Sequence, residues 1–201
     1  MSDQITKESL DRSFKLLSGR LDLARTEAVR LVICGGSALI ATGLRNRTTH
    51  DADIVALMNE ARELVSPEPL PPFLLEASTQ VARDLGLSPR WLNNGPSQDD
   101  GGLFQMGLPG GFASRLTECI FGPRLTVYYI GRIDQIHFKL YAAADQSDPT
   151  HLADLRALNP TGPELEAAAR WTMTHDVSAG FRWVLQELLK QIGHESIAKN
   201  I

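Results

Sequence analysis

The sequence predicts an α/β (α+β) protein with strands in its first part and helices in its last. Two aliphatic, β-branched runs, residues 28–34 and 51–57, carry the strand prediction. Beyond Arg132 the apolar residues recur at helical spacing to the end of the chain. We therefore expect an α/β core over residues 1–131 and a helical C-terminal region over residues 132–201, packed on the core.

Composition excludes several other classes of protein. A hydrophobic fraction of 43% with 22% charged residues is ordinary for a globular domain, which argues against a disordered chain or a fibre. The formal net charge of -4 argues against binding along extended DNA, which calls for a basic surface. No apolar run approaches the roughly 20 residues of a membrane span. Cys34 and Cys119 lie far apart in apolar surroundings, so we expect reduced thiols in a cytoplasmic protein.

Local patterns predict each element in turn. Apolar residues at helical spacing predict a helix over residues 5–25, and the strand over residues 28–34 stops at Gly35-Gly36. A short helix over residues 37–43 precedes the second strand, over residues 51–57. The rest comprises a proline-rich loop over 66–72, a helix over 73–85, a polar loop over 88–111, a hairpin over 116–121 and 125–130, and helices over 133–144, 152–158, 163–173 and 181–192.

The triplet Gly35-Gly36-Ser37 stands where a strand feeds a helix. Glycines let an anion come close to the backbone, and the start of a helix offers free N–H groups and the positive end of its dipole. The Ser37 hydroxyl is a donor suited to a phosphate oxygen. The triplet is therefore a candidate phosphate cradle, although a Gly-Gly turn before any helix has the same sequence.

A pair of aspartates, Asp51 and Asp53, begins the second strand. In a strand, residues two apart point to one face with Cα atoms about 6.6–6.8 Å apart. Two carboxylates that close repel each other unless a cation or solvent separates them. Mg²⁺, or Mn²⁺ in its place, suits such a pair and accepts substrate phosphate as a further ligand. The alternative is a solvated pair at a strand start.

The glycine triplet and the aspartate pair are stronger evidence for a phosphate site together than apart. A strand, a turn, a short helix and a return strand would bring them side by side. Arg45 and Arg47 lie between them and would neutralise phosphate charge, or else belong to a solvated connection. The string from Gly35 through Arg47 to Asp53 resembles the nucleotidyltransferase superfamily. The resemblance implies a polymerase-β-like core with a mixed sheet, in which Asp51 and Asp53 bind the metal.

The resemblance extends to the AbiEii-type, toxin-antitoxin-associated nucleotidyltransferases and to uncharacterised bacterial families around them. Those relatives carry a Lys-Leu pair on a later helix and an acidic segment after it, matched here by Lys139-Leu140 and Asp154-Leu155. It implies that Lys139 reaches a phosphate, whereas a surface lysine on an amphipathic helix is the alternative. Active members have a third carboxylate on a neighbouring strand, for which Glu118 is the best substitute.

The resemblance implies a Mg²⁺-dependent enzyme that moves a nucleotidyl group from an NTP to an acceptor, which would be a protein, a tRNA end or a small molecule. Gly35, Gly36 and Ser37 would hold the triphosphate, and residues 91–96, in a long polar loop, would contact the acceptor or the base. Two alternatives remain open. The chain would otherwise be a catalytically silent nucleotide-binding or toxin-antitoxin interaction module, or a metal-dependent phosphohydrolase that uses the same aspartates.

Overall fold

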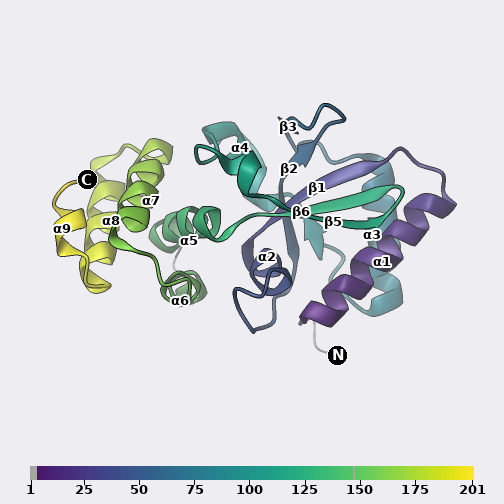
Figure 1. Ribbon diagram of the computed structural model, residues 1–201, viewed down its shortest axis with the longest axis horizontal. Coiled ribbons are helices and arrows are strands. Elements are labelled where there is room, and N and C mark those ends of the chain that lie inside the picture. The colour runs from purple at the N-terminus through teal and green to yellow at the C-terminus, as the bar shows by residue number, and fades with distance from the viewer. Residues whose placement is uncertain (1–3, 147) are drawn as a thin grey trace. The chain divides into compact units, whose positions relative to one another are not determined.

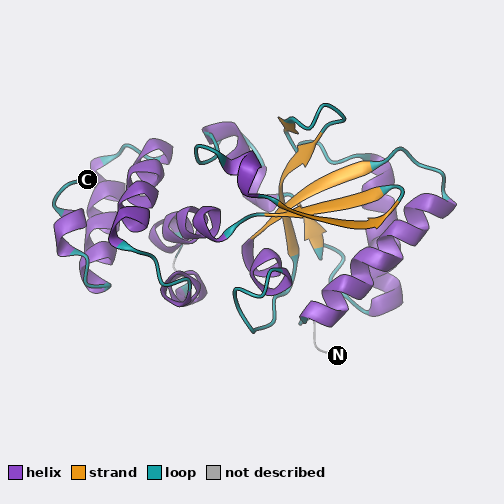
Figure 2. Cartoon of the chain, viewed as in Figure 1, coloured by secondary structure: helices purple, strands orange, loops and turns teal. Residues whose placement is uncertain are grey.

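The structure is a computed structural model that describes residues 4–146 and 148–201. The chain divides into two compact units that join at Ile130 and Gly131. In the first unit, helices and strands alternate around one sheet, whereas the second unit consists of helices (Figures 1 and 2). The protein is thus of the mixed α/β class, as predicted.

The first unit contains, within its described residues, a mixed sheet of six strands. Five strands follow the order β3-β2-β1-β6-β5, and β4 pairs with β2 at its start. Strand β1 is parallel to β6 and β2 is parallel to β4, whereas the other neighbours are antiparallel. The strands are β1 (Val29–Cys34), β2 (Ala52–Met58), β3 (Leu64–Val65), β4 (Leu92–Asn93), β5 (Thr117–Gly122) and β6 (Leu125–Tyr129).

Among the described residues of this unit, four helices and two short 3-10 helices accompany the sheet. The first helix follows Thr6, which caps it together with Ser9, and it buries Leu10, Phe14, Leu17 and Leu21. Side chains at positions three and four apart form one face of a helix, which explains why this segment packs on the sheet. The elements are α1 (Lys7–Leu23), α2 (Gly35–Ala41), α3 (Pro72–Leu85), η1 (Gly95–Ser97), α4 (Leu103–Met106) and η2 (Phe112–Arg115).

The strand alternation places Asp53 and Glu118 on the same face of the sheet. Asp53 lies opposite Cys34, whereas Tyr128 lies opposite both Val32 and Glu118. Val32 and Cys34 are two residues apart in β1, so their side chains and those of their direct partners share a face.

The opposite face carries the core under α1. Phe14 of α1 is fully buried, with its ring centroid 5.6 Å from that of Trp91. Tyr129 follows Tyr128 and so points to this side. Burial raises the pKa of Tyr129, and nearby Cys119 and Asp11 of α1 raise it further.

Strand β2 contains an irregularity next to β1. Val32 pairs with Ala56 and Ile33 pairs with Ile54, so Val55 has no partner in β1. This is the pattern of a β-bulge, in which one extra residue is left out of the ladder. The Ser97 hydroxyl of η1 donates a hydrogen bond of 2.8 Å to the carbonyl oxygen of Val55. The free backbone group at the bulge is therefore satisfied by a side chain.

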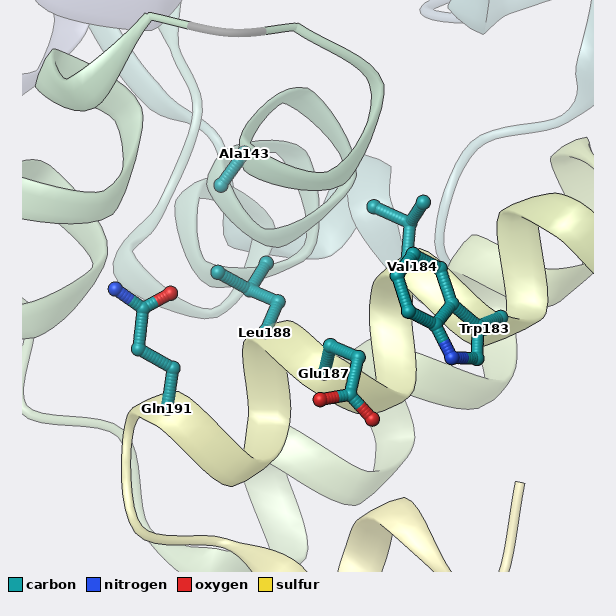
Figure 3. A pocket seen from close by; sticks show the side chains of 6 residues that line it. All are labelled: Ala143, Trp183, Val184, Glu187, Leu188 and Gln191. Atoms are coloured by element: carbon teal, nitrogen blue, oxygen red, sulfur yellow. The ribbon is translucent and has the colours of Figure 1, made fainter.

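The second unit begins with α5 (Arg132–Asp145) and continues through α6 (Pro149–Ala157), α7 (Gly162–His175), α8 (Ala179–Gln191) and α9 (Glu195–Ala198). Helix α5 packs against α6, α7 and α8. A pocket of about 410 Å³ lies between α5 and α8 (Figure 3). It is lined by Ala143, Trp183, Val184, Glu187, Leu188 and Gln191. The Trp183 side chain is exposed, in contrast to the buried Trp91 of the first unit.

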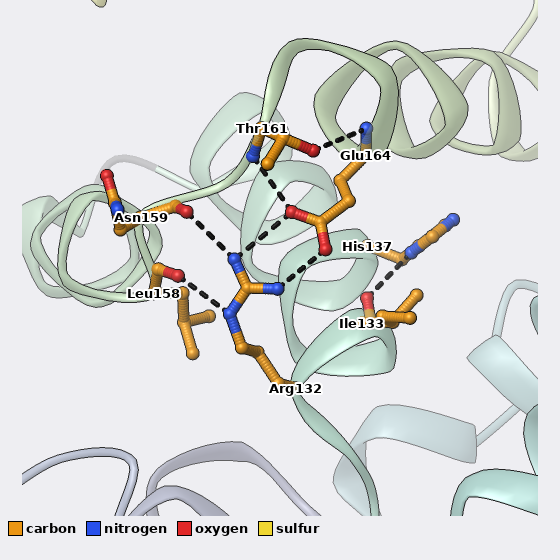
Figure 4. Close-up of polar contacts among 7 residues, drawn as sticks. All are labelled: Arg132, Ile133, His137, Leu158, Asn159, Thr161 and Glu164. Atoms are coloured by element: carbon orange, nitrogen blue, oxygen red, sulfur yellow. Dashed lines mark hydrogen bonds and ion pairs between the residues drawn. The ribbon is translucent and has the colours of Figure 1, made fainter.

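Arg132 joins the start of α5 to the segment between α6 and α7 (Figure 4). Its guanidinium donates to Glu164 through two nitrogens, at 2.6 and 3.1 Å, and to the carbonyl oxygens of Leu158 and Asn159. Glu164 also accepts from the Thr161 backbone N–H and thereby caps α7. The paired guanidinium, above all, lowers the pKa of Glu164 to about 2.

Candidate functional site

The diglycine turn lies directly against Asp53. Cys34, the last residue of β1, pairs with Asp53, so the chain enters α2 next to the aspartate. Gly35 has a φ of +69°, which L residues with a side chain rarely adopt. A Cβ placed on Gly35 would lie 2.8 Å from Asp53 Oδ2, closer than such atoms approach. Glycine is therefore required here both by the backbone and by the carboxylate.

Gly36 makes a second close approach, to residues from the connection that leads into β2. A Cβ on Gly36 would lie 2.6 Å from Thr49 Oγ1 and 2.7 Å from Arg47 Nη2. Arg47 Nη1 donates a hydrogen bond of 2.6 Å to the carbonyl oxygen of Thr48. One guanidinium and one carboxylate thus approach two successive glycines.

Two details of the triplet differ from expectation. The diglycine turn, Gly35 and Gly36, does not precede the helix but is itself the first part of α2, a helix of seven residues. Ser37 is fully buried, and its hydroxyl donates to the carbonyl oxygen of Cys34 at 3.1 Å. The hydroxyl that was expected to meet a phosphate therefore ties the helix back to the end of β1. The reason is local, since a serine three residues into this turn reaches the preceding carbonyl.

Asp51 and Asp53 stand at the start of β2, with Asp51 one residue before the strand. Both are half-buried, whereas Ala52 and Ile54 between and after them are fully buried. This alternation is the one expected of a strand with one face in the core. Within the described residues, no three His, Cys, Asp or Glu side chains gather where they could hold a metal ion. Two carboxylates fit a Mg²⁺ ion that also takes phosphate oxygens and water as ligands.

Asn93 touches Asp53 and was not among the candidate residues. Strand β4 places Asn93 opposite Asp53, and Asn93 Nδ2 donates a hydrogen bond of 3.1 Å to Asp53 Oδ1. Asn93 falls within residues 91–96, the segment expected to contact the acceptor or the base. Sequence patterns do not indicate this pairing, because β4 consists of only Leu92 and Asn93.

Glu118 does not join the aspartates. It lies on β5, and strands β1 and β6 separate β5 from β2. Three strand spacings amount to about 14 Å, far beyond the reach of a shared metal ion. Glu118 accepts a hydrogen bond of 2.7 Å from the Tyr128 hydroxyl and lies 3.5 Å from Arg62 Nη2. Burial, and after it this hydrogen bond, raises the pKa of Tyr128.

The remaining candidates have different surroundings. Arg45 is half-buried in the connection between α2 and β2, where its backbone N–H bonds to the Leu39 carbonyl oxygen. Lys139 lies on α5 of the second unit, and its Nζ is 2.9 Å from Asp154 Oδ2 on α6. Lys139 is thus buried, and it is not a solvated lysine on an amphipathic helix. Its charge is neutralised by Asp154 inside the helical unit.

Comparison of the chain with protein-family models, with curated proteins and with solved structures finds no match. None of the helices in the described part of the chain combines the length and the apolar character that crossing a membrane requires.

Proposed function

We propose that this chain is a Mg²⁺-dependent nucleotidyltransferase with a polymerase-β-like core. The observation that carries the proposal is the close approach of Asp53 Oδ2 and Arg47 Nη2 to two successive glycines. A phosphate chain beside these glycines would meet a guanidinium and a carboxylate to which a metal ion could bridge it.

Each residue then has a defined task. Gly35 and Gly36 let the triphosphate approach the backbone, and Arg47, with Arg45 beside it in sequence, offsets phosphate charge. Asp51 and Asp53 would hold Mg²⁺ or Mn²⁺, which when bound draws charge from the phosphates. An acceptor hydroxyl would form a bond to the α-phosphorus, lose its proton to solvent and displace pyrophosphate. The acceptor would be a protein, a tRNA end or a small molecule, in a toxin-antitoxin setting or another cytoplasmic one.

The test is a paired measurement on the whole protein. We expect wild-type protein, given each labelled NTP with Mg²⁺ or Mn²⁺ and a cell extract as acceptor source, to release pyrophosphate and to label an acceptor. Asp51→Asn with Asp53→Asn should abolish both and leave the thermal unfolding temperature within a few degrees. Asp99→Asn with Asp100→Asn, in the long loop, is a matched control that removes the same charge. Unchanged turnover in the first double variant would remove the proposal.

The distance of Glu118 from the aspartates favours a second candidate, a nucleotide-binding module without turnover. A site with two carboxylates in place of three would still bind a metal–nucleotide complex. We expect such a module to be stabilised against unfolding by NTP and Mg²⁺ together while no product forms. The phosphohydrolase alternative is distinguished by release of orthophosphate or nucleoside monophosphate without a labelled acceptor.

A further inference from the structure

Asn93 has a carboxamide that is fixed at both ends. Its Oδ1 accepts a hydrogen bond of 2.8 Å from the Gly95 backbone N–H, and its Nδ2 donates to Asp53 Oδ1 and to the Arg90 carbonyl oxygen. An amide has one acceptor end and one donor end. Since the acceptor end is occupied by Gly95, the donor end must face Asp53.

The backbone around Asn93 is equally well held. The Ala52 N–H donates to the Trp91 carbonyl oxygen, which fixes β4 to the start of β2. Trp91 is fully buried, and its Nε1 donates a hydrogen bond of 3.0 Å to the Ser78 carbonyl oxygen of α3. A Cβ on Gly95 would lie 2.9 Å from Asn93 Oδ1, so glycine is needed there for the turn to close on the amide. The position of Asn93 is therefore set by buried structure rather than by its own contact with Asp53.

The two oxygens of Asp53 consequently have different surroundings. Oδ1 is bonded to the Asn93 amide, whereas Oδ2 faces Gly35. We propose that Asn93 is a positioning residue for Asp53, one that fixes the orientation of the carboxylate beside the diglycine turn and, through it, the binding of a cation with nucleotide phosphates. This inference rests on the proposed function. Because Asn93 is neutral and donates a proton, we also infer that the site holds its divalent cation chiefly together with nucleotide phosphates.

Binding, measured without turnover, tests this role. We would titrate full-length protein with ATP and with GTP by calorimetry, each with Mn²⁺ and with EDTA in its place, and with Mn²⁺ alone. Residues that orient a metal ligand typically change metal affinity by roughly 10–100-fold when they are removed. We expect Asn93→Ala to weaken Mn²⁺–nucleotide binding about tenfold or more and to leave binding in EDTA unchanged, a split that general loss of structure would not produce.

Asn94 provides a matched control. It is the next residue, it is buried, and its Nδ2 donates a hydrogen bond of 3.0 Å to the Pro67 carbonyl oxygen, away from Asp53. Asn94→Ala should lower stability at least as much as Asn93→Ala and leave the ratio of Mn²⁺-dependent to Mn²⁺-independent binding unchanged. If both variants change that ratio equally, Asn93 has no special relation to the metal and the inference is wrong.

A second variant reverses the chemistry. Asn93→Asp replaces the amide donor by a carboxylate oxygen beside Asp53 Oδ1, and the added charge and ligand should tighten binding of Mn²⁺ alone at least about tenfold. Binding of Mn²⁺ no tighter than in wild type would overturn the inference. Failure of the proposed function has a separate signature, since Asp53→Asn would then retain full Mn²⁺-dependent nucleotide binding.

Discussion

Lys139 and Asp154 form an ion pair inside the helical unit, with 2.9 Å between Nζ and Oδ2 and with side chains 6% and 0% exposed. His151 lies 3.5 Å from the same Nζ. Removing one member of a buried pair leaves the other charge without compensation, at a cost of about 3–5 kcal/mol. Lys139 is therefore a structural cation of α5 whatever further contact it makes.

A double-mutant cycle on this pair should show strong coupling. We expect Asp154→Leu and Lys139→Met each to lower the free energy of unfolding by about 3 kcal/mol or more. The double variant Lys139→Met, Asp154→Leu should lose much less than the sum, as measured by urea unfolding. The exposed pair Lys190–Glu187 of α8 is the control, for which a coupling of about 0–1 kcal/mol is expected. Additive losses at Lys139 and Asp154 would contradict the buried pair.

Substitution of Gly36 should cost stability. In Gly36→Ala the new methyl group meets Thr49 Oγ1 and Arg47 Nη2, so the connection before β2 must shift, at about 1–3 kcal/mol. Gly19→Ala, inside α1 with no atom within 4 Å of the added Cβ, should instead stabilise by about 0.5–1 kcal/mol. Urea midpoints of the two variants measured side by side decide the matter. A Gly36→Ala protein as stable as wild type would show that Arg47 and Thr49 do not press on the turn.

Glu164 should make stability depend on pH in the acid range. Because Arg132 and the Thr161 N–H lower its pKa from 4.5 to about 2, its stabilisation is present above about pH 4.5 and is lost as pH falls toward 2. Glu164→Gln should cost about 1 kcal/mol at pH 7, since the partly exposed pair is screened by water. The difference from wild type should vanish near pH 2 in guanidinium unfolding curves. Glu166→Gln, which breaks the exposed pair with Arg170, is the control and should change little at any pH.

His175 should act in a higher pH range. Burial lowers the pKa of the His175 imidazole from 6.5. Its Nδ1 lies 3.2 Å from the Trp171 carbonyl oxygen. Its Nε2 is buried and has no hydrogen-bond partner among the described residues. The unfolded chain therefore takes up a proton first as pH falls below about 6.5, and stability falls with it. His175→Phe should remove this loss, of roughly 1 kcal/mol or less between pH 7.5 and 5.5, in urea unfolding. Parallel pH profiles for the two proteins would refute it.

Sequence patterns predicted the elements that contain long apolar runs or clear periodicity. The strand before Gly35 and the strand after Asp51 were found within one residue of their expected positions, because each has enough buried aliphatic residues to define it. The long polar loop was harder, since β4, η1 and α4 are two to four residues long and are held by side-chain hydrogen bonds such as that of Ser97 to Val55. Propensity carries little information over such lengths.

The candidate site was predicted in part for the same reason. The approach of the diglycine turn to Asp53 follows from two consecutive strands with a short connection, which sequence alone indicates. Sequence did not indicate that Ser37 would turn its hydroxyl to Cys34 or that Asn93 would bond to Asp53. Both depend on the direction of one side chain. The place of Glu118 depends on strand order, and its strand lies at the far edge of the sheet.

The bulge at Val55 decides which side chain of β2 stands beside the diglycine turn. With continuous pairing from Val32↔Ala56, Ile54 would stand opposite Cys34, and the carboxylate of Asp53 would point into the hydrocarbon interior under α1. The extra residue is Val55, whose carbonyl oxygen accepts a hydrogen bond from the Ser97 hydroxyl. It shifts the pairing by one residue, so that Asp53 and not Ile54 stands opposite Cys34. Loss of the bulge with Val55 retained would therefore bury the acid and expose the isoleucine, whereas deletion of Val55 would leave Asp53 opposite Cys34.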